Sequence, residues 1–307
     1  MIKTITKFFA FATILKNLLE TKKGDISGNT QIHPSKFPGR TIFVREKEYF
    51  IRESYVDGTT PIVFLHSWGS DSLGSWFKVL PKIKNKNSFI AIDLSNHGKS
   101  DSSWKRWDVD ENADLVISIL EKLDIEECDI VGWSMGSAVG MSVSRKKQSL
   151  IRKLVLITPF SWLGGAVYSD KIAFKVFISF VRIRERLFPN FNPQSKFSFL
   201  RKSQSIEDEY TEWAWNNLHR SKDDFIYGDG GRFVVPYDAR PWIHEIHSDT
   251  LVITGGKDKL VPEETSNEVI NRLNTVKSKV INDAGHSVPW THADELLEEI
   301  NSFLNNE

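Results

Sequence analysis

Short apolar runs recur along the chain at the spacing expected of strands in an α/β protein. Continuous apolar runs are typical of strands buried on both faces of a parallel sheet, and they occupy residues 61–65, 88–92, 153–157 and 250–254. A strand pair is expected before them at 41–44 and 49–54, and a last strand at 278–282. Because helical patterns alternate with these runs, as at 109–123 and 294–304, the sequence predicts a doubly wound, mostly parallel sheet.

The last helix carries an N-terminal signal of its own. Thr291 precedes Asp294 by three residues, which is the spacing of a capping box. We therefore expect the hydroxyl of Thr291 to cap this helix.

Residues 160–240 interrupt the alternation of strands and helices. Two helical patterns, at 171–187 and 205–218, flank a passage rich in Pro, Asn and Ser. We predict an inserted helical cap over residues 160–240, which divides the core into residues 40–159 and 241–307.

The N-terminal residues 1–39 stand apart from this core. Residues 1–20 have the apolar stripe of an amphipathic helix, with lysines off the stripe, and residues 21–39 have the composition of a linker. Three interpretations stay open: a helix on a membrane surface, a helix packed on the domain, and a cleaved signal peptide. Since the apolar run 8–15 is too short to span a bilayer, we expect a cytoplasmic protein, with peripheral membrane contact under the first interpretation.

The most informative stretch, residues 128–144, is an apolar run followed by GWSMG and small residues at helical spacing. This order predicts a strand, a tight turn with Ser134 at its tip, and a helix. Gly132 and Gly136 stand where the neighbouring backbones approach closely, and Gly140 lets the helix lie close to the sheet. A serine presented at a helix N-terminus is a candidate nucleophile, and the N–H of Met135 is a candidate oxyanion donor.

A serine needs a base, and the base needs an orienting acid. His286 follows the last predicted strand, and Asp258 follows the strand before it. The order Ser134, Asp258, His286 is the one expected for a nucleophile elbow on such a sheet. Asp283 is the nearest competitor for the acid, but it lies on the same loop as His286 and is badly placed to reach the far ring nitrogen.

Residues 66–69 (HSWG) directly follow a buried strand. A loop there can turn a backbone N–H towards Ser134, and this N–H would form an oxyanion hole together with that of Met135. His66 has the residue type of a catalytic base, but we expect it to support the loop through hydrogen bonds.

The charge balance and the cysteine content exclude some kinds of ligand and cross-link. The 307 residues include 40 basic and 40 acidic side chains, so no net field attracts nucleic acid or polyanionic substrates. The single cysteine, Cys128, excludes an internal disulfide and is expected to be a small core residue. We expect neither a metal nor an organic cofactor, and the sequence leaves the oligomeric state undetermined.

Several motifs together resemble the α/β-hydrolase superfamily, of the serine esterase, haloperoxidase-like and meta-cleavage hydrolase type. They are HSWG, DLSNHGKS at 93–100, GWSMG, GGKDKLVP at 255–262 and AGH at 284–286. The resemblance implies Ser134 as nucleophile, His286 as base and Asp258 as its partner, with Trp68 and Met135 as backbone donors. Two positions depart from the family's usual glycine: Ser67 adds a side chain beside the oxyanion loop, and Asn96 is a milder change because Asn tolerates a left-handed backbone.

The sequence thus predicts a serine hydrolase that cleaves a carboxylic ester through an acyl-enzyme. Carbon–carbon bond hydrolysis, thioester hydrolysis, acyl transfer and peracid formation use the same residues and remain open, as does a ligand-binding protein that keeps the fold without turnover. Aromatic side chains in the predicted cap favour an apolar small-molecule substrate, and they are Phe160, Trp162, Phe174, Phe177, Phe180, Trp213 and Trp215.

Overall fold

The computed structural model describes residues 37–101, 108–163, 179, 183, 234, 236–261 and 263–305. The predicted amphipathic helix at residues 1–20, most of the predicted linker and nearly all of the predicted cap lie outside these residues. Among the described residues, no helix is both long enough and apolar enough to cross a membrane.

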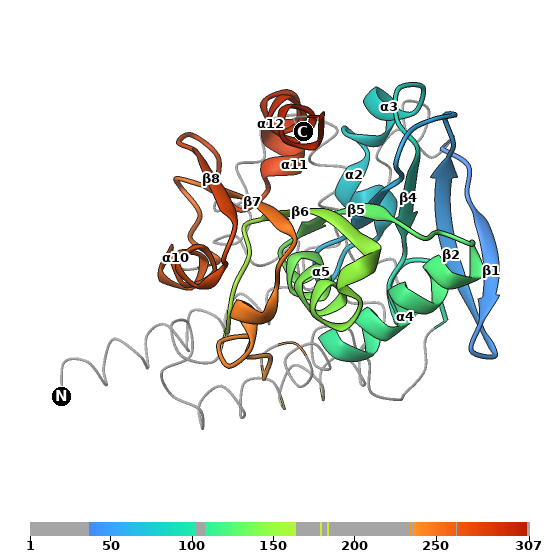
Figure 1. Cartoon of the computed structure of the whole chain (residues 1–307), viewed down its shortest axis with the longest axis horizontal. Coiled ribbons are helices and arrows are strands. Elements are labelled where there is room, and N and C mark those ends of the chain that lie inside the picture. The colour runs from blue at the N-terminus through green and yellow to red at the C-terminus, as the bar shows by residue number, and fades with distance from the viewer. Residues whose placement is uncertain are drawn as a thin grey trace.

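The described core is built on one sheet of eight strands (Figure 1). Along the sheet their order is β1-β2-β4-β3-β5-β6-β7-β8. The pairings of β1 with β2 and of β2 with β4 are antiparallel, and all later pairings are parallel, so the prediction of a mostly parallel sheet is confirmed. The strands are β1 (Arg40–Val44), β2 (Lys47–Ser54), β3 (Ile62–Leu65), β4 (Phe89–Ile92), β5 (Cys128–Trp133), β6 (Ile151–Ile157), β7 (Asp249–Gly255) and β8 (Val276–Ile281).

Helices cover both faces of the sheet (Figure 1). One face carries α4 (Val109–Lys122), α5 (Met135–Lys146) and α10 (Glu263–Arg272), and the other carries α2 (Ser72–Trp76), α3 (Leu80–Ile83), α11 (Val288–Thr291) and α12 (Ala293–Asn305). Short 3-10 turns lie at η2 (Gln148–Leu150) and η4 (Ile243–Glu245). Each face has its own apolar cluster, because side chains on a strand alternate between the faces and both faces are covered.

The strand register brings the chemistry-bearing loops to one edge. Leu65, the last residue of β3, pairs with Gly132, and Gly132 pairs with Leu156 of β6. The loops that follow β3 and β5 therefore leave the sheet at the same level. Carboxyl ends of parallel strands are where open α/β sheets hold their ligands.

The predicted capping box at Thr291 is wrong. Thr291 is the last residue of α11, and its hydroxyl donates to the carbonyl of Ser287 at 3.1 Å and contacts His292 Nδ1 at 2.8 Å. Because the turn that contains Pro289 already forms a helix, the hydroxyl is used four residues back along the chain rather than at the start of α12.

A compact junction, which we call the neck, joins residues 160–162 to residues 237–240. Trp162 and Asp238 form an isolated antiparallel bridge, and the N–H of Ala239 donates to the carbonyl of Ser161 at 2.7 Å. The Arg240 guanidinium lies 3.9 Å from the centre of the Trp162 ring and forms an ion pair with Asp238. Trp162 therefore packs within the neck, as does the buried Phe160.

Candidate active site

Ser134 sits in a strained turn between β5 and α5. Its backbone has φ 54° and ψ −112°, a conformation that residues with a side chain rarely adopt. The helix begins at the next residue, Met135, whose N–H lies in the first turn and so has no intrahelical acceptor. The predicted strand, tight turn and helix are therefore present, with the serine at the turn.

The two glycines that flank Ser134 are required by backbone contact. A Cβ on Gly132 would lie 2.4 Å from the carbonyl oxygen of Gly136, and one on Gly136 would lie 2.1 Å from that of Leu65. Gly140 is less constrained, since its Cβ would meet the side chain of Ile130 at 3.0 Å. The turn can be this tight only without side chains at its two ends.

Asp258 and His286 form a buried pair at the ends of β7 and β8. His286 Nδ1 lies 2.8 Å from Asp258 Oδ2, and the two side chains are only 4% and 8% exposed. The other carboxylate oxygen accepts the N–H groups of Leu260 at 2.8 Å and Val261 at 3.1 Å. Burial alone raises the pKa of Asp258, but His286 and these N–H groups outweigh it and hold the pKa below the usual range.

Close contact between the two loops produces that pairing. The N–H of Gly256 donates to Ile281 O at 2.9 Å, and the N–H of Lys257 donates to Ala284 O at 2.8 Å. A Cβ on Gly255 would lie 2.2 Å from Gly285 O, so only glycine lets the strands end this close together. Backbone hydrogen bonds therefore join the loop that carries Asp258 to the loop that carries His286.

Asp283, the competing acid, faces elsewhere. Its carboxylate is 81% exposed and pairs with Lys257 at 2.7 Å. The structure therefore brings His286 to Asp258 and leaves Asp283 at the surface.

A contact that the sequence did not predict links His286, the candidate base, to the residue before Ser134. The indole N–H of Trp133 donates to the backbone carbonyl of His286 at 2.9 Å, and the two rings lie 5.9 Å apart. The apolar side chain in the GWSMG motif was the only sequence signal, and it does not specify a partner.

Hydrogen bonds among serine residues hold the loop after β3. Its Ser67 N–H donates to Ser75 Oγ at 3.3 Å, and Ser70 N–H donates to Ser67 O at 3.2 Å. Trp68 lies on this loop and is half-buried, next to Gly69 with φ 78°. The roles of Trp68 and Met135 as oxyanion donors stay a prediction.

His66 supports this loop, as predicted. Its Nε2 accepts the N–H of Leu94 at 2.9 Å, which leaves the proton on Nδ1 to donate to Ser67 O at 2.8 Å. Complete burial lowers the pKa of His66 to about 4, so the neutral ring persists at neutral pH. Both nitrogens of this histidine are used on backbone atoms.

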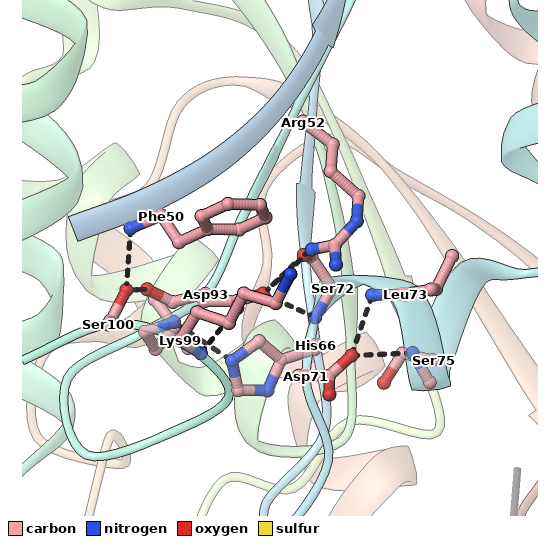
Figure 2. A network of polar contacts seen from close by, with 12 residues as sticks. Phe50, Arg52, His66, Asp71, Ser72, Leu73, Ser75, Asp93, Lys99 and Ser100 are labelled. Atoms are coloured by element: carbon pink, nitrogen blue, oxygen red, sulfur yellow. Dashed lines mark hydrogen bonds and ion pairs between the residues drawn. The ribbon is translucent and has the colours of Figure 1, made fainter. Parts of the chain in front are cut away.

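Charged and polar side chains from β2, from α2 and from the segment after β4 form a network next to this loop (Figure 2). Arg52 of β2 reaches Asp93, after β4, at 3.3 Å, and also contacts Ser72 of α2. Asp93 accepts the N–H groups of Ser72 and Lys99, each at 2.9 Å. The first residue of the DLSNHGKS motif thus ties β2, β4 and α2 together.

Two further sequence predictions are settled by the backbone and by burial. Asn96 has φ 61°, a left-handed backbone of the kind that Asn was expected to tolerate there. Cys128 is buried, and burial raises the pKa of its thiol, so it behaves as a core residue. In the described part of the chain, no group of three or more His, Cys, Asp or Glu side chains could hold a metal ion.

Comparison with known proteins agrees with this geometry. A dihydrolipoyllysine-residue acetyltransferase component of the acetoin cleaving system from Pseudomonas putida is 28% identical over 255 residues, which is 81% of this chain and 64% of that protein. Pyrrolizixenacetamide deacetylase from Xenorhabdus hominickii is 25% identical over 82% of this chain and 94% of its own. The structure of an esterase from Exiguobacterium antarcticum has a TM-score of 0.74 at 17% identity, covering 88% of this chain and all (100%) of the other.

The family model described as alpha/beta hydrolase fold matches residues 60–293. This match spans the elbow, both loops of the Asp258–His286 pair and the loop after β3, and the strand order and helix layers agree with it. The chain belongs to the alpha/beta hydrolase fold family.

Proposed function

We propose that this protein is a serine hydrolase that cleaves a carboxylic ester of an apolar small molecule through an acyl-enzyme. The observation that carries the proposal is the buried pair of His286 and Asp258, 2.8 Å apart, on the loops that follow β7 and β8. Nδ1 engages the acid, so Nε2 is the nitrogen available to the serine. Ser134 is the nucleophile that this pair activates. Its backbone has a positive φ, and it directly follows Trp133, whose side chain contacts His286.

In this mechanism His286 takes the hydroxyl proton of Ser134 as Oγ attacks the carbonyl carbon. The N–H groups of Met135 and Trp68 stabilise the oxyanion, and His286 then gives its proton to the leaving alcohol. Water activated by the same histidine hydrolyses the acyl-enzyme. Asp258 stays ionised and keeps the imidazole in one tautomer and orientation.

The relatives support acyl chemistry and leave the acceptor open. The deacetylase, 25% identical over 82% of this chain, supports removal of an acyl group to water. The acetyltransferase component, 28% identical, supports transfer to another acceptor as the second candidate function. The chain spans 64% of the acetyltransferase component. Hydrolysis and acyl transfer therefore need to be separated by experiment.

Labelling with a fluorophosphonate tests the nucleophile. We expect the wild-type protein to be labelled once, at Ser134, and Ser134→Ala to remain unlabelled although it folds. A ligand-binding protein without turnover would leave both unlabelled. Ser137→Ala is the matched control and should be labelled like wild type, because the Ser137 hydroxyl lies three residues away in α5 and donates to the carbonyls of Gly132 and Ile157.

A substrate panel then defines the reaction. It contains p-nitrophenyl esters of rising acyl length, a thioester and a vinylogous diketone, each with and without an added alcohol acceptor. We expect kcat/KM for esters to rise with acyl length and then fall, because each buried methylene contributes about 0.8 kcal/mol until the pocket is full. A preference for acetate alone, or product found only on the acceptor, would contradict the proposed substrate or the proposed hydrolysis.

A further inference from the structure

Trp133 connects the two halves of the proposed catalytic machinery. It is the last residue of β5 and immediately precedes Ser134, while its side chain donates Nε1–H to the backbone carbonyl of His286 at 2.9 Å. The nucleophile and the base come from segments more than 150 residues apart, since 153 positions separate Trp133 from His286. This hydrogen bond joins them directly.

The indole that makes this bond is itself fixed by packing. Trp133 is 2% exposed, and its ring lies 5.3 Å from that of Trp290 at 74° and 6.4 Å from that of Trp76 at 69°. Edge-to-face pairs of this kind define the orientation of a ring. The donor therefore has a fixed direction.

We propose that Trp133 is a positioning residue for His286, a role that rests on the serine hydrolase function proposed above. Asp258 holds one end of the imidazole through Nδ1, and Trp133 holds the main chain from which the imidazole projects. These two bonds together set where Nε2 points. Because Trp133 and Ser134 are consecutive, any shift of the elbow moves the anchor of the base with the nucleophile.

The size of the effect follows from the sensitivity of proton transfer to geometry. A misplacement of about 1 Å can lower the rate by about 100-fold, even when it originates away from the reacting atoms. Phe keeps most of the ring of Trp133 but has no donor, so Trp133→Phe releases the His286 carbonyl while retaining much of the packing.

Trp290 offers a matched control in the same aromatic cluster. It is 1% exposed, and its Nε1–H also donates to a backbone carbonyl at 2.9 Å, that of Gly74 in α2. Trp290→Phe therefore removes the same kind of bond while keeping an aromatic ring against Trp133. Its acceptor belongs to a helix rather than to the base.

The experiment compares the two variants in the full chain by steady-state kinetics and by the rate of fluorophosphonate inactivation. We expect Trp133→Phe to lower kcat and the inactivation rate about 10- to 100-fold, with KM within about twofold of wild type. Trp290→Phe should change kcat, KM and the inactivation rate by less than about twofold. Thermal unfolding of both variants shows whether their losses of stability are comparable.

Proton NMR supplies a readout that a merely structural role would not change. The low-field resonance of the His286 Nδ1 proton, assigned by its absence in His286→Gln, should be sharp in wild type and in Trp290→Phe. In Trp133→Phe it should broaden, because an imidazole whose main chain is no longer held exposes that proton to exchange.

Two outcomes would overturn the proposal: inactivation of Trp133→Phe at the wild-type rate, or equal slowing in both variants. If Trp133→Phe does not fold, 3-benzothienylalanine at position 133 keeps the shape of indole without the N–H, and the same comparison applies. Failure of wild type itself to be labelled would instead refute the serine hydrolase function. The two failures are thus distinguishable.

Discussion

Two buried histidines, one after β3 and one in the loop after β8, show how different surroundings give one residue type different roles. His66 is fully buried and His286 is 3% exposed, so burial does not distinguish them. His66 has both ring nitrogens on backbone atoms, those of Leu94 and Ser67. His286 has a carboxylate on one nitrogen and lies beside the residue that precedes Ser134.

The two histidines differ in how readily the neutral ring can take up a second proton. His66 would have to give up the Leu94 N–H to gain a proton, and burial without a facing carboxylate at hydrogen-bond distance makes its cation unfavourable. The Asp258 carboxylate can stabilise the imidazolium of His286 during proton transfer. The candidate base is therefore identified by the carboxylate that can stabilise its charged form, and not by how deeply the histidine is buried.

The carboxylates of the two regions differ in the same way. Asp93 pairs with Arg52 and with backbone N–H groups, which commits it to holding β2, β4 and α2 together. Asp258 also accepts two backbone N–H groups, but only on one oxygen, and the other faces His286. Four predictions test this contrast between a supporting network and a reactive one.

The largest expected effect is on turnover at the reactive pair. Ser134→Ala and His286→Ala should each lower kcat by at least about 10⁴-fold, and the double variant should be little worse, because these residues act as a unit. His66→Gln should retain kcat within about tenfold in the molecules that fold. Steady-state kinetics on one ester measures all four variants, and a loss in His66→Gln equal to that in His286→Ala would abolish the distinction between the histidines.

The second prediction separates the two aspartates near the base. Asp258→Asn should lower kcat about 10³- to 10⁴-fold, because the amide can favour the wrong imidazole tautomer and cannot stabilise the cation. Asp283→Asn removes only a surface pair with Lys257 and should change kcat by less than about twofold. Similar activity in the two variants would show that Asp258 does not orient the base.

The third prediction concerns stability rather than turnover. Arg52→Met leaves Asp93 buried and uncompensated, so it should lower the free energy of unfolding by about 3–5 kcal/mol. Arg40→Met, which breaks the partly exposed pair with Glu53 on the adjacent strand, should cost at most about 1 kcal/mol. Urea denaturation measures both, and equal losses would mean that the Arg52–Asp93 pair is not specially coupled to the core.

The fourth prediction is a pH dependence of stability within the supporting network. The pKa of His66 is about 4 in the folded chain against 6.5 for the free side chain, so the unfolded chain binds more protons between these values. Stability is therefore lost as the pH falls through this window, by up to about 3 kcal/mol near pH 4. Asp71, whose carboxylate caps α2 by accepting the N–H groups of Leu73 and Gly74, opposes this loss: burial and the charge of Asp93 raise its pKa, so the folded chain takes up that proton first.

Urea denaturation at pH 7, 6, 5 and 4 resolves these two contributions. His66→Gln should make the loss of stability towards pH 4 shallower than in wild type, and Asp71→Asn should make it steeper. The slopes are compared rather than the absolute values, because each substitution also changes hydrogen bonds. Parallel slopes in all three proteins would show that neither group titrates differently on folding.

Much of the reactive region could be predicted from sequence because its signals are local. Gly132, Ser134 and Gly136 fall within five residues, between an apolar run and small residues at helical spacing, and this local order predicts the turn. Asp258 and His286 each follow a predicted strand, and the rule that parallel strands end at one edge brings the two loops together. The left-handed backbone at Asn96 was indicated by the resemblance, because the family usually has glycine there, and Asn tolerates that backbone.

The supporting network could not be predicted, because its contacts are distant in sequence and its helices are short. Arg52 and Asp93 are 41 positions apart, and nothing in an alternating strand indicates that an arginine side chain is buried. Helices α2 and α11 have five and four residues, too few to show a helical period, and α11 is the reason that Thr291 ends one helix and does not cap the next. The Trp133–His286 bond depends on the strand order, which the sequence leaves undetermined.

The neck has a consequence for how this chain tolerates change. Trp162, Asp238 and Arg240 hold together the two segments that lead into and out of residues 164–233, so an insert placed there starts from ends that are already close in space. For a flexible insert, each doubling of length adds only about 0.6 kcal/mol of closure entropy. The neck is therefore a suitable junction for domain grafting, because the contacts between its two segments need no redesign.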